Sequence, residues 1–162
     1  MATESQPSSP GVHFPPPILF VLGVVLAWLL ETRVRRIRLL SGSASAAPLE
    51  AMGVALLAAG ILLIFWGLFI FARAKTGIIP NRPATRIVDY GPYAFTRNPM
   101  YTGMTIAYLG GVLILNSVWM LILLPLVILA LYRLVIQREE RYLVSAFPQE
   151  YEEYRRKVRR WL

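Results

Sequence analysis

The sequence contains no cysteine and a single histidine, His13. Without thiols there can be no disulfides, thiolate metal sites or cysteine nucleophiles, and one histidine within a Pro- and Ser-rich segment argues against a zinc site. Charge is also sparse, because only 16% of the residues are charged, and nine acidic residues stand against 17 basic ones. We therefore expect a basic protein of net charge +8 that binds no metal.

Apolar residues, in contrast, are abundant. They make up 56% of the 162 residues, with a mean hydropathy of +0.53. A soluble domain of this size could not bury so much apolar surface, so a bilayer is the expected solvent. Residues 1–13 lack a basic start and are poor in core-forming residues, which predicts a disordered tail, with a signal peptide as the alternative. We expect residues 14–162 to form one domain, with its catalytic part at about 73–162.

Four segments approach the length of about 20 apolar residues that a helix needs to cross a bilayer. The first two are Phe14–Leu30 and Ala51–Ala72. The uncharged run Met100–Tyr132 is long enough for two more, with a turn at Asn116–Ser117. Pro125 is expected to kink the fourth helix. The sequence thus predicts an all-α integral membrane protein with four transmembrane helices, the third and fourth forming a tight hairpin.

The basic residues predict the orientation of these helices. The loop Arg73–Arg97 and the tail after Arg133 would share one face of the membrane, and they hold 13 of the 17 basic residues. By the positive-inside rule this face, which carries the catalytic part, is cytoplasmic. The four arginines of the cluster Arg33–Arg38 would lie on the opposite side of the membrane, which conflicts with the rule. The prediction follows the face that holds the larger number of basic residues.

Small residues recur in the predicted helices at spacings that allow backbones to approach closely. They are Gly53, Gly60 and Gly67 in the second helix, and Gly103, Ala107 and Gly111 in the third. We interpret both stripes as packing within one bundle, while a homodimer contact stays open.

The C-terminal segment is predicted to form an amphipathic helix. Pro148 suits a first helical turn, and the residues Tyr151, Tyr154, Val158 and Trp161 recur at helical spacing among charged neighbours. Such a helix would lie on the membrane surface with its rings toward the acyl chains. As a simple anchor it would need no further function.

Polar residues gather at the ends of the predicted third and fourth helices. Glu139 and Glu140 follow the fourth helix, while the stretch Gly91–Met104 offers a guanidinium at Arg97 and an amide at Asn98. Carboxylates near a bilayer are costly unless they are paired or solvated, so they suggest a site. The alternative is a solvated helix end with an ordinary Glu–Arg pair.

Two motifs occur in this order. "GPYAFTRNPMYTG" is followed, after a hydrophobic hairpin, by "EERYLVSAFPQEYEEYRRKVRRW". Together they resemble the family of isoprenylcysteine carboxyl methyltransferases and related phospholipid methyltransferases, over about Thr85 to Trp161. The resemblance implies an enzyme that uses S-adenosylmethionine. The cofactor-binding residues that it implies are Tyr93, Asn98, Pro99, Met100, Tyr101 and Glu139, with Thr85, Arg86, Ile87 and Val88.

The chain departs from the family pattern at three positions. Asn98 stands where the family has histidine, and Pro148 where it has glycine. An arginine that the family places before the carboxylates has no clean match, because Arg133 and Arg138 are both close and Val135 occupies the aligned position. The catalytic candidates are Arg97, Arg138 and Glu140.

The predicted function is methyl transfer from S-adenosylmethionine to a small or lipophilic acceptor, which can be a carboxylate, a thiol or an amine. Without a histidine at position 98, an acceptor that is already nucleophilic is favoured. Two alternatives stay open: an NADPH-dependent membrane reductase of similar architecture, and a non-catalytic lipid-binding protein. The expected partners are the acceptor and membrane lipids, and no nucleic acid.

Overall fold

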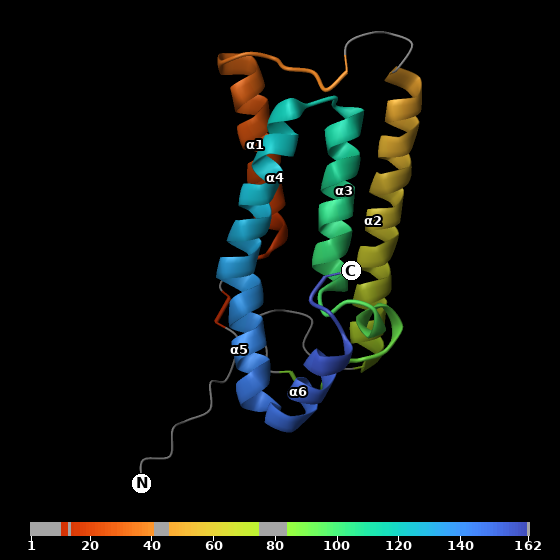
Figure 1. Ribbon diagram of the computed structural model, residues 1–162, viewed down its shortest axis with the longest axis vertical. Coiled ribbons are helices and arrows are strands. Elements are labelled where there is room, and N and C mark those ends of the chain that lie inside the picture. The colour runs from red at the N-terminus through yellow and green to blue at the C-terminus, as the bar shows by residue number, and fades with distance from the viewer. Residues whose placement is uncertain (1–10, 13, 41–45, 75–83, 162) are drawn as a thin grey trace.

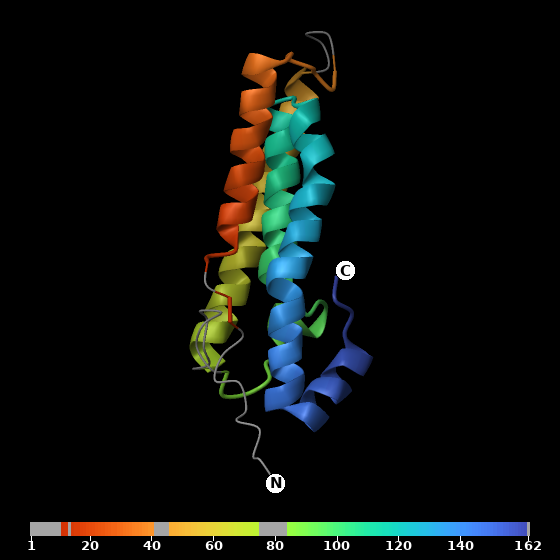
Figure 2. The same cartoon turned by 90° about the vertical axis from the view of Figure 1, so that its left-hand side faces the viewer.

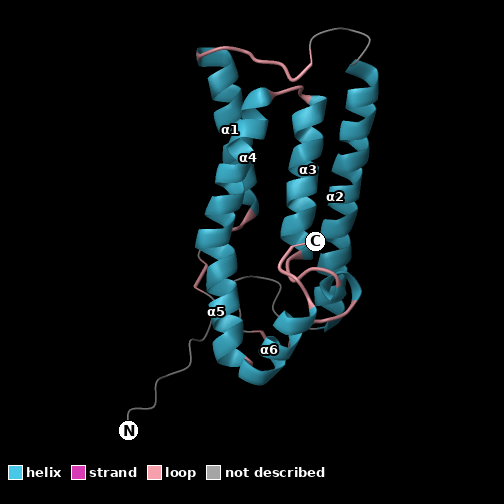
Figure 3. Cartoon of the chain, viewed as in Figure 1, coloured by secondary structure: helices cyan, strands magenta, loops and turns pink. Residues whose placement is uncertain are grey.

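A computed structural model of the chain describes residues 11–12, 14–40, 46–74 and 84–161, so most of the predicted N-terminal tail lies outside the described residues. Every regular element among these residues is helical, which confirms the predicted all-α class (Figure 3). The elements are α1 (Pro17–Arg33), α2 (Ala46–Ala74), η1 (Gly91–Ala94), α3 (Pro99–Ile114), α4 (Val118–Leu131), η2 (Tyr132–Ile136), α5 (Gln137–Ala146) and α6 (Pro148–Lys157).

Helices α1 to α4 lie side by side as a bundle, and α5 continues α4 beyond the end of the bundle (Figure 1). Helix α6 then turns back beside α5 (Figure 2). The core is formed by α1, α3 and α4, where Phe20 contacts Tyr108 with their ring centroids 6.0 Å apart. Helix α1 begins three residues after the predicted position, and α2 begins five residues before it.

Local sequence explains where α3 and α4 begin. Pro99 occupies the first turn of α3, where a missing N–H is harmless. The turn between the two helices contains Asn116, which has a positive φ of 49°, as an asparagine tolerates. Ser117 then caps α4, because its Oγ accepts a hydrogen bond from the Met120 N–H at 3.2 Å.

Helices α2 and α3 pack through their glycines. A methyl group added at Gly60 would lie 2.5 Å from both the Ala107 nitrogen and the Gly103 oxygen. One at Gly110 would lie 2.6 Å from the Gly53 oxygen. The predicted close packing within the bundle is therefore present. Gly111 also packs within the bundle, but against Met120 of α4 and not against α2, because strict four-residue spacing drifts off a 3.6-residue face.

The outer surface of the bundle is apolar. Among the described residues, Ala47–Ala74 and Val118–Ala146 are long and apolar enough to cross a membrane, and Pro99–Ile114 is a shorter apolar helix. On α2, Leu62 is 69% exposed and Phe65 is 65% exposed. Side chains of this kind on a continuous apolar face indicate contact with lipid, so the chain has the character of a membrane protein.

Helix α6 is amphipathic, but its apolar face is not turned toward lipid. Tyr151, Tyr154 and Val158 are buried against Ile87 and neighbouring side chains of α5. The predicted orientation of these rings toward the acyl chains is therefore wrong. A periodic pattern identifies which residues share a face, but not whether that face meets lipid or protein.

A π-helical turn, η2, joins α4 to α5. Because this turn is wider than an α-helical turn, the side chains of α5 point in different directions from those that a continuous α4 would give them. π-helical turns occur frequently at functional sites. The turn lies directly before α5, which begins with the segment that contains Glu139 and Glu140.

The basic cluster Arg33–Arg38 lies at the end of the bundle opposite to α6 (Figure 1). The Ile37 oxygen accepts a hydrogen bond from the Val118 N–H at 3.2 Å, and the Arg35 oxygen accepts one from the Trp119 indole at 2.7 Å. Basic residues therefore occur at both ends of the bundle, as the sequence indicated.

Candidate active site

The C-terminal segment after α6 binds to the backbone and side chains of the first motif. The Arg97 N–H donates to the Arg159 oxygen at 2.9 Å. The Thr96 hydroxyl and the Asn98 amide both donate to the Arg160 oxygen, at 3.0 Å and 3.1 Å. These three bonds place the end of the second motif directly against the residues that precede α3.

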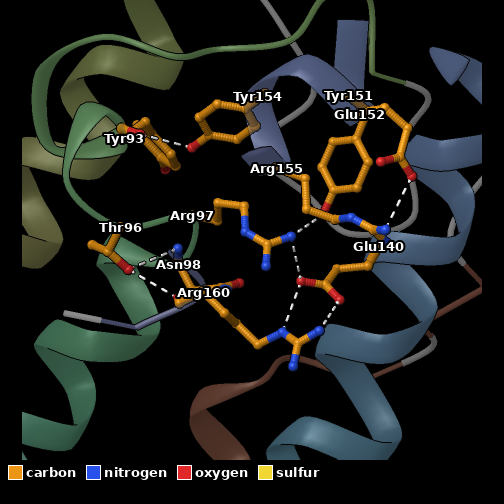
Figure 4. A network of polar contacts seen from close by, with 10 residues as sticks. All are labelled: Tyr93, Thr96, Arg97, Asn98, Glu140, Tyr151, Glu152, Tyr154, Arg155 and Arg160. Atoms are coloured by element: carbon orange, nitrogen blue, oxygen red, sulfur yellow. Dashed lines mark hydrogen bonds and ion pairs between the residues drawn. The ribbon is translucent and has the colours of Figure 1, made fainter. Parts of the chain in front are cut away.

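Glu140 lies at the centre of an ion-pair network (Figure 4). Its carboxylate accepts two hydrogen bonds from Arg160, at 2.9 Å and 2.7 Å, and it pairs with Arg97 at 3.1 Å. Arg97 also donates to the Tyr151 hydroxyl at 3.1 Å. Two guanidinium groups thus share one carboxylate, which leaves a net positive charge in this network.

Glu139 forms a second polar contact beside the network. It accepts a hydrogen bond from the Tyr101 hydroxyl at 2.7 Å, which links α5 to α3. The hydroxyl of Tyr93 is buried and has no hydrogen-bond partner among the described residues. Its backbone oxygen, however, accepts a bond from the Tyr154 hydroxyl at 2.8 Å.

Burial determines the protonation of the phenols. It raises the pKa of Tyr93, Tyr151 and Tyr154 above the ordinary value, and the charges of Glu139 and Glu140 add to the effect at Tyr93 and Tyr151. The hydrogen bond to Glu140 raises the pKa of Arg160. The three hydroxyls therefore act as neutral hydrogen-bonding groups, and Arg160 stays charged.

The other predicted cofactor residues occupy different surroundings. Pro99 is buried, and Met100 packs close to Gly67 of α2. Val88 is buried with Tyr93, Ile87 packs against α6, and Thr85 and Arg86 are exposed.

Arg138 does not join the network of Glu140. Its guanidinium donates to the Gly11 oxygen at 3.1 Å, near Val12, which is buried in the core. Arg133 is exposed. Arg133 and Arg138 are the two candidates for the arginine that the family places before the carboxylates, and neither contacts Glu140. Arg97 of the first motif does contact it.

Sequence reasoning missed Arg160 and Thr96, and it misplaced Tyr151. Arg160 is one of several arginines in the run "RRKVRRW", and no local pattern separates it from its neighbours. Tyr151 did carry a signal, because it lies within the second motif. No group of three or more metal-ligating side chains occurs within the part of the chain that the structure describes.

The fold and the site together define a helical membrane protein with a cluster of polar contacts at one end of its bundle, built from two sequence motifs. A sequence model of the phospholipid methyltransferase family matches residues 49–150, which is more than half of the chain. The chain belongs to this family of membrane methyltransferases. The match includes Tyr93, Arg97, Glu139 and Glu140, and it ends before Tyr151.

Two curated proteins are similar to parts of the chain. One is a protein-S-isoprenylcysteine O-methyltransferase of Schizosaccharomyces pombe, which is 40% identical over 72 residues, or 44% of this chain and 30% of that protein. The other is the cobalt-zinc-cadmium resistance protein CzcN of Cupriavidus metallidurans, which is 35% identical over 80 residues, or 49% of this chain and 37% of that protein. The similarity thus spans about a third of each relative. No solved structure matches the chain.

Proposed function

We propose that this protein transfers a methyl group from S-adenosylmethionine to a lipophilic or small acceptor at the α6 end of its bundle. The observation that carries the proposal is the contact between Tyr101 and Glu139, 2.7 Å long. It joins the two motifs beside the buried hydroxyl of Tyr93, which has no hydrogen-bond partner in the part of the chain that the structure describes. Membership of the phospholipid methyltransferase family supports the same reaction class, and it does not favour the reductase.

The residues around Glu139 suit the polar groups of S-adenosylmethionine. A carboxylate can accept hydrogen bonds from a ribose diol, and a guanidinium can bind an α-carboxylate. The Arg97 Nε and the Tyr93 hydroxyl are both buried, and neither has a hydrogen-bond partner among the described residues. Buried polar atoms are normally satisfied, so these two are suited to contacts with a bound cofactor.

In this proposal Glu139 and Tyr93 hold the ribose and Arg97 holds the amino-acid end. The bound cofactor supplies an electrophilic methyl group on a sulfonium. Glu140 keeps Arg97 in position through their 3.1 Å ion pair. The protein's main contribution is alignment, because an in-line displacement needs little covalent help from side chains. Asn98, which donates to the Arg160 oxygen, has a positioning role and transfers no proton.

For the membrane arrangement we infer four spans, α1 to α4, with the α6 end cytoplasmic. The charge majority in the sequence favours this orientation. The side-by-side packing of the four helices supports the number of spans (Figure 2). A methyl acceptor dissolved in lipid would then reach the site from the side of the bundle, and S-adenosylmethionine from water.

The direct test is calorimetry of the purified full chain in detergent with S-adenosylmethionine and, in parallel, with NADPH. We expect binding of S-adenosylmethionine only, and transfer of label from labelled S-adenosylmethionine to a lipid extract. Binding of NADPH alone would favour the reductase. Binding of neither compound by a folded protein would favour the non-catalytic lipid-binding alternative.

A further inference from the structure

An open apolar groove runs along the outside of α4. It has a volume of about 540 Å³ and is lined by Leu124, Pro125, Ile128, Leu129, Tyr132, Arg160 and Trp161. From Leu124 of α4 to Tyr132 of η2 the lining residues cover eight helical steps, or about 12 Å at 1.5 Å per residue. The groove therefore offers an apolar surface along the helix on which part of one hydrocarbon chain could lie.

One end of the groove is cationic. The Arg160 guanidinium lies over the Tyr132 ring, 5.1 Å from its centroid. Its Nε and Nη2 donate to Glu140, which leaves Nη1 without an acceptor among the described residues. In Figure 4 this third nitrogen points away from Glu140. Because Arg97 shares the same carboxylate, the network has a surplus positive charge that would attract an anion.

The order of residues along the groove matches the depth profile of a bilayer leaflet. Arg160 and Tyr132 lie together at the end where α4 gives way to the charged segment, and Leu124 lies eight positions earlier in the apolar helix. Aromatic rings and arginines are the side chains that favour the headgroup level, and leucines the acyl level. The groove is thus apolar where a lipid is apolar and cationic where an anionic headgroup would lie.

We propose that this groove binds one anionic phospholipid of the surrounding bilayer, with an acyl chain along α4 and its phosphate at Arg160 Nη1. The bound lipid is a resident and does not react. Its headgroup would hold the C-terminal segment against Thr96 and Asn98, because the Arg160 oxygen accepts hydrogen bonds from both. The α4 residues of the groove take no part in the contact between Tyr101 and Glu139, so lipid binding along α4 can be tested separately from methyl transfer, although Arg160 shares Glu140 with Arg97.

The test is native mass spectrometry of the full chain in detergent with equal amounts of phosphatidylglycerol and phosphatidylcholine. We expect one phosphatidylglycerol to be retained with roughly tenfold preference, the scale of a single hydrogen bond to a charged group. Equal retention of the two lipids would overturn the proposal.

Two pairs of variants locate the binding site. Leu129→Trp fills the groove, and Leu126→Trp is its control, because both leucines are exposed on α4, at 50% and 59%, and only Leu129 lines the groove. Arg160→Gln removes the headgroup contact, and Arg156→Gln removes an exposed charge elsewhere. We expect retention to fall about tenfold in the first member of each pair and to persist in the second.

Retention by Leu129→Trp at the unaltered level would contradict the location, even if Arg160→Gln failed to fold. If Leu129→Trp instead converts a dimer into a monomer, the groove is a contact between two copies of the chain and the proposal is wrong. Calorimetry with S-adenosylmethionine on the same variants separates this result from a failure of the proposed function, because we expect Leu129→Trp to bind the cofactor normally.

Discussion

At the scale of single residues, the two adjacent glutamates have different roles. Glu139 accepts from Tyr101 of α3, whereas Glu140 binds two arginines. Successive residues of a helix point about 100° apart, so neighbours in sequence contact different parts of the structure. Glu139 therefore belongs to the proposed cofactor contact, and Glu140 to the docking of the C-terminal segment.

We predict that Glu139→Ala weakens the binding of S-adenosylmethionine by about 1.5 to 3 kcal/mol, the scale of a hydrogen bond to a charged group. Calorimetry measures the change, with Glu153→Ala, an exposed position on α6, as the control. Unchanged affinity in a folded Glu139→Ala protein would remove this carboxylate from the site.

Glu140→Gln is expected to loosen the C-terminal segment, because Arg97 and Arg160 would both lose their anionic partner. The free energy of unfolding should fall by roughly 1.5 to 3 kcal/mol. Amide exchange should accelerate at Arg97, whose N–H donates to the Arg159 oxygen.

The matched control for Glu140→Gln is Glu152→Gln. Glu152 pairs with Arg155 at 3.2 Å on the surface, with half of the arginine side chain exposed. Exposed pairs contribute about 1 kcal/mol or less. Equal effects of the two substitutions would show that the network of Glu140 does not hold the segment.

At the scale of elements, the structure depends on the close approach of α2 and α3. We predict that Gly60→Ala destabilises the protein by about 1 to 3 kcal/mol, because its methyl group would meet backbone atoms of Gly103 and Ala107 at 2.5 Å and force the helices apart. Gly111→Ala is the control, since only the end of the Met120 side chain approaches it, at 3.4 Å.

Thermal unfolding in detergent measures both glycine variants. Alanine is the better helix former by about 1 kcal/mol, so Gly111→Ala should be neutral or slightly stabilising. A Gly60→Ala protein as stable as Gly111→Ala would mean that the two helices are not packed as closely as the distances indicate.

At the scale of the whole molecule, the proposed topology places Asp89 and Arg156 on the cytoplasmic side and Arg38 on the other. The absence of native cysteine permits single-cysteine labelling without background. We expect an impermeant thiol reagent to label Asp89→Cys and Arg156→Cys from the same side, and Arg38→Cys from the opposite side. Labelling of positions 38 and 156 from one side would contradict the three spans, α2 to α4, that the proposed topology places between them.

The sequence alone determined the helical class, the apolar segments and the two motifs, because composition and periodicity are local properties of the chain. It also identified Glu139 and Tyr101 as related, through the resemblance of both motifs to one family. Gly60 and Gly103 could be recognised as helix-contact residues from their spacing, because small residues at helical spacing in membrane helices typically mark close packing between helices.

Only the tertiary structure decided which partner each face meets. The aromatic face of α6 packs on protein, and Arg160 reaches Glu140 across 20 positions of sequence. The periodicity of α6 is the same whether its rings touch lipid or protein, so no local pattern could distinguish these outcomes. Arg138 and Arg160 are equally basic in sequence, and the path of the backbone alone placed one beside Gly11 and the other beside Glu140.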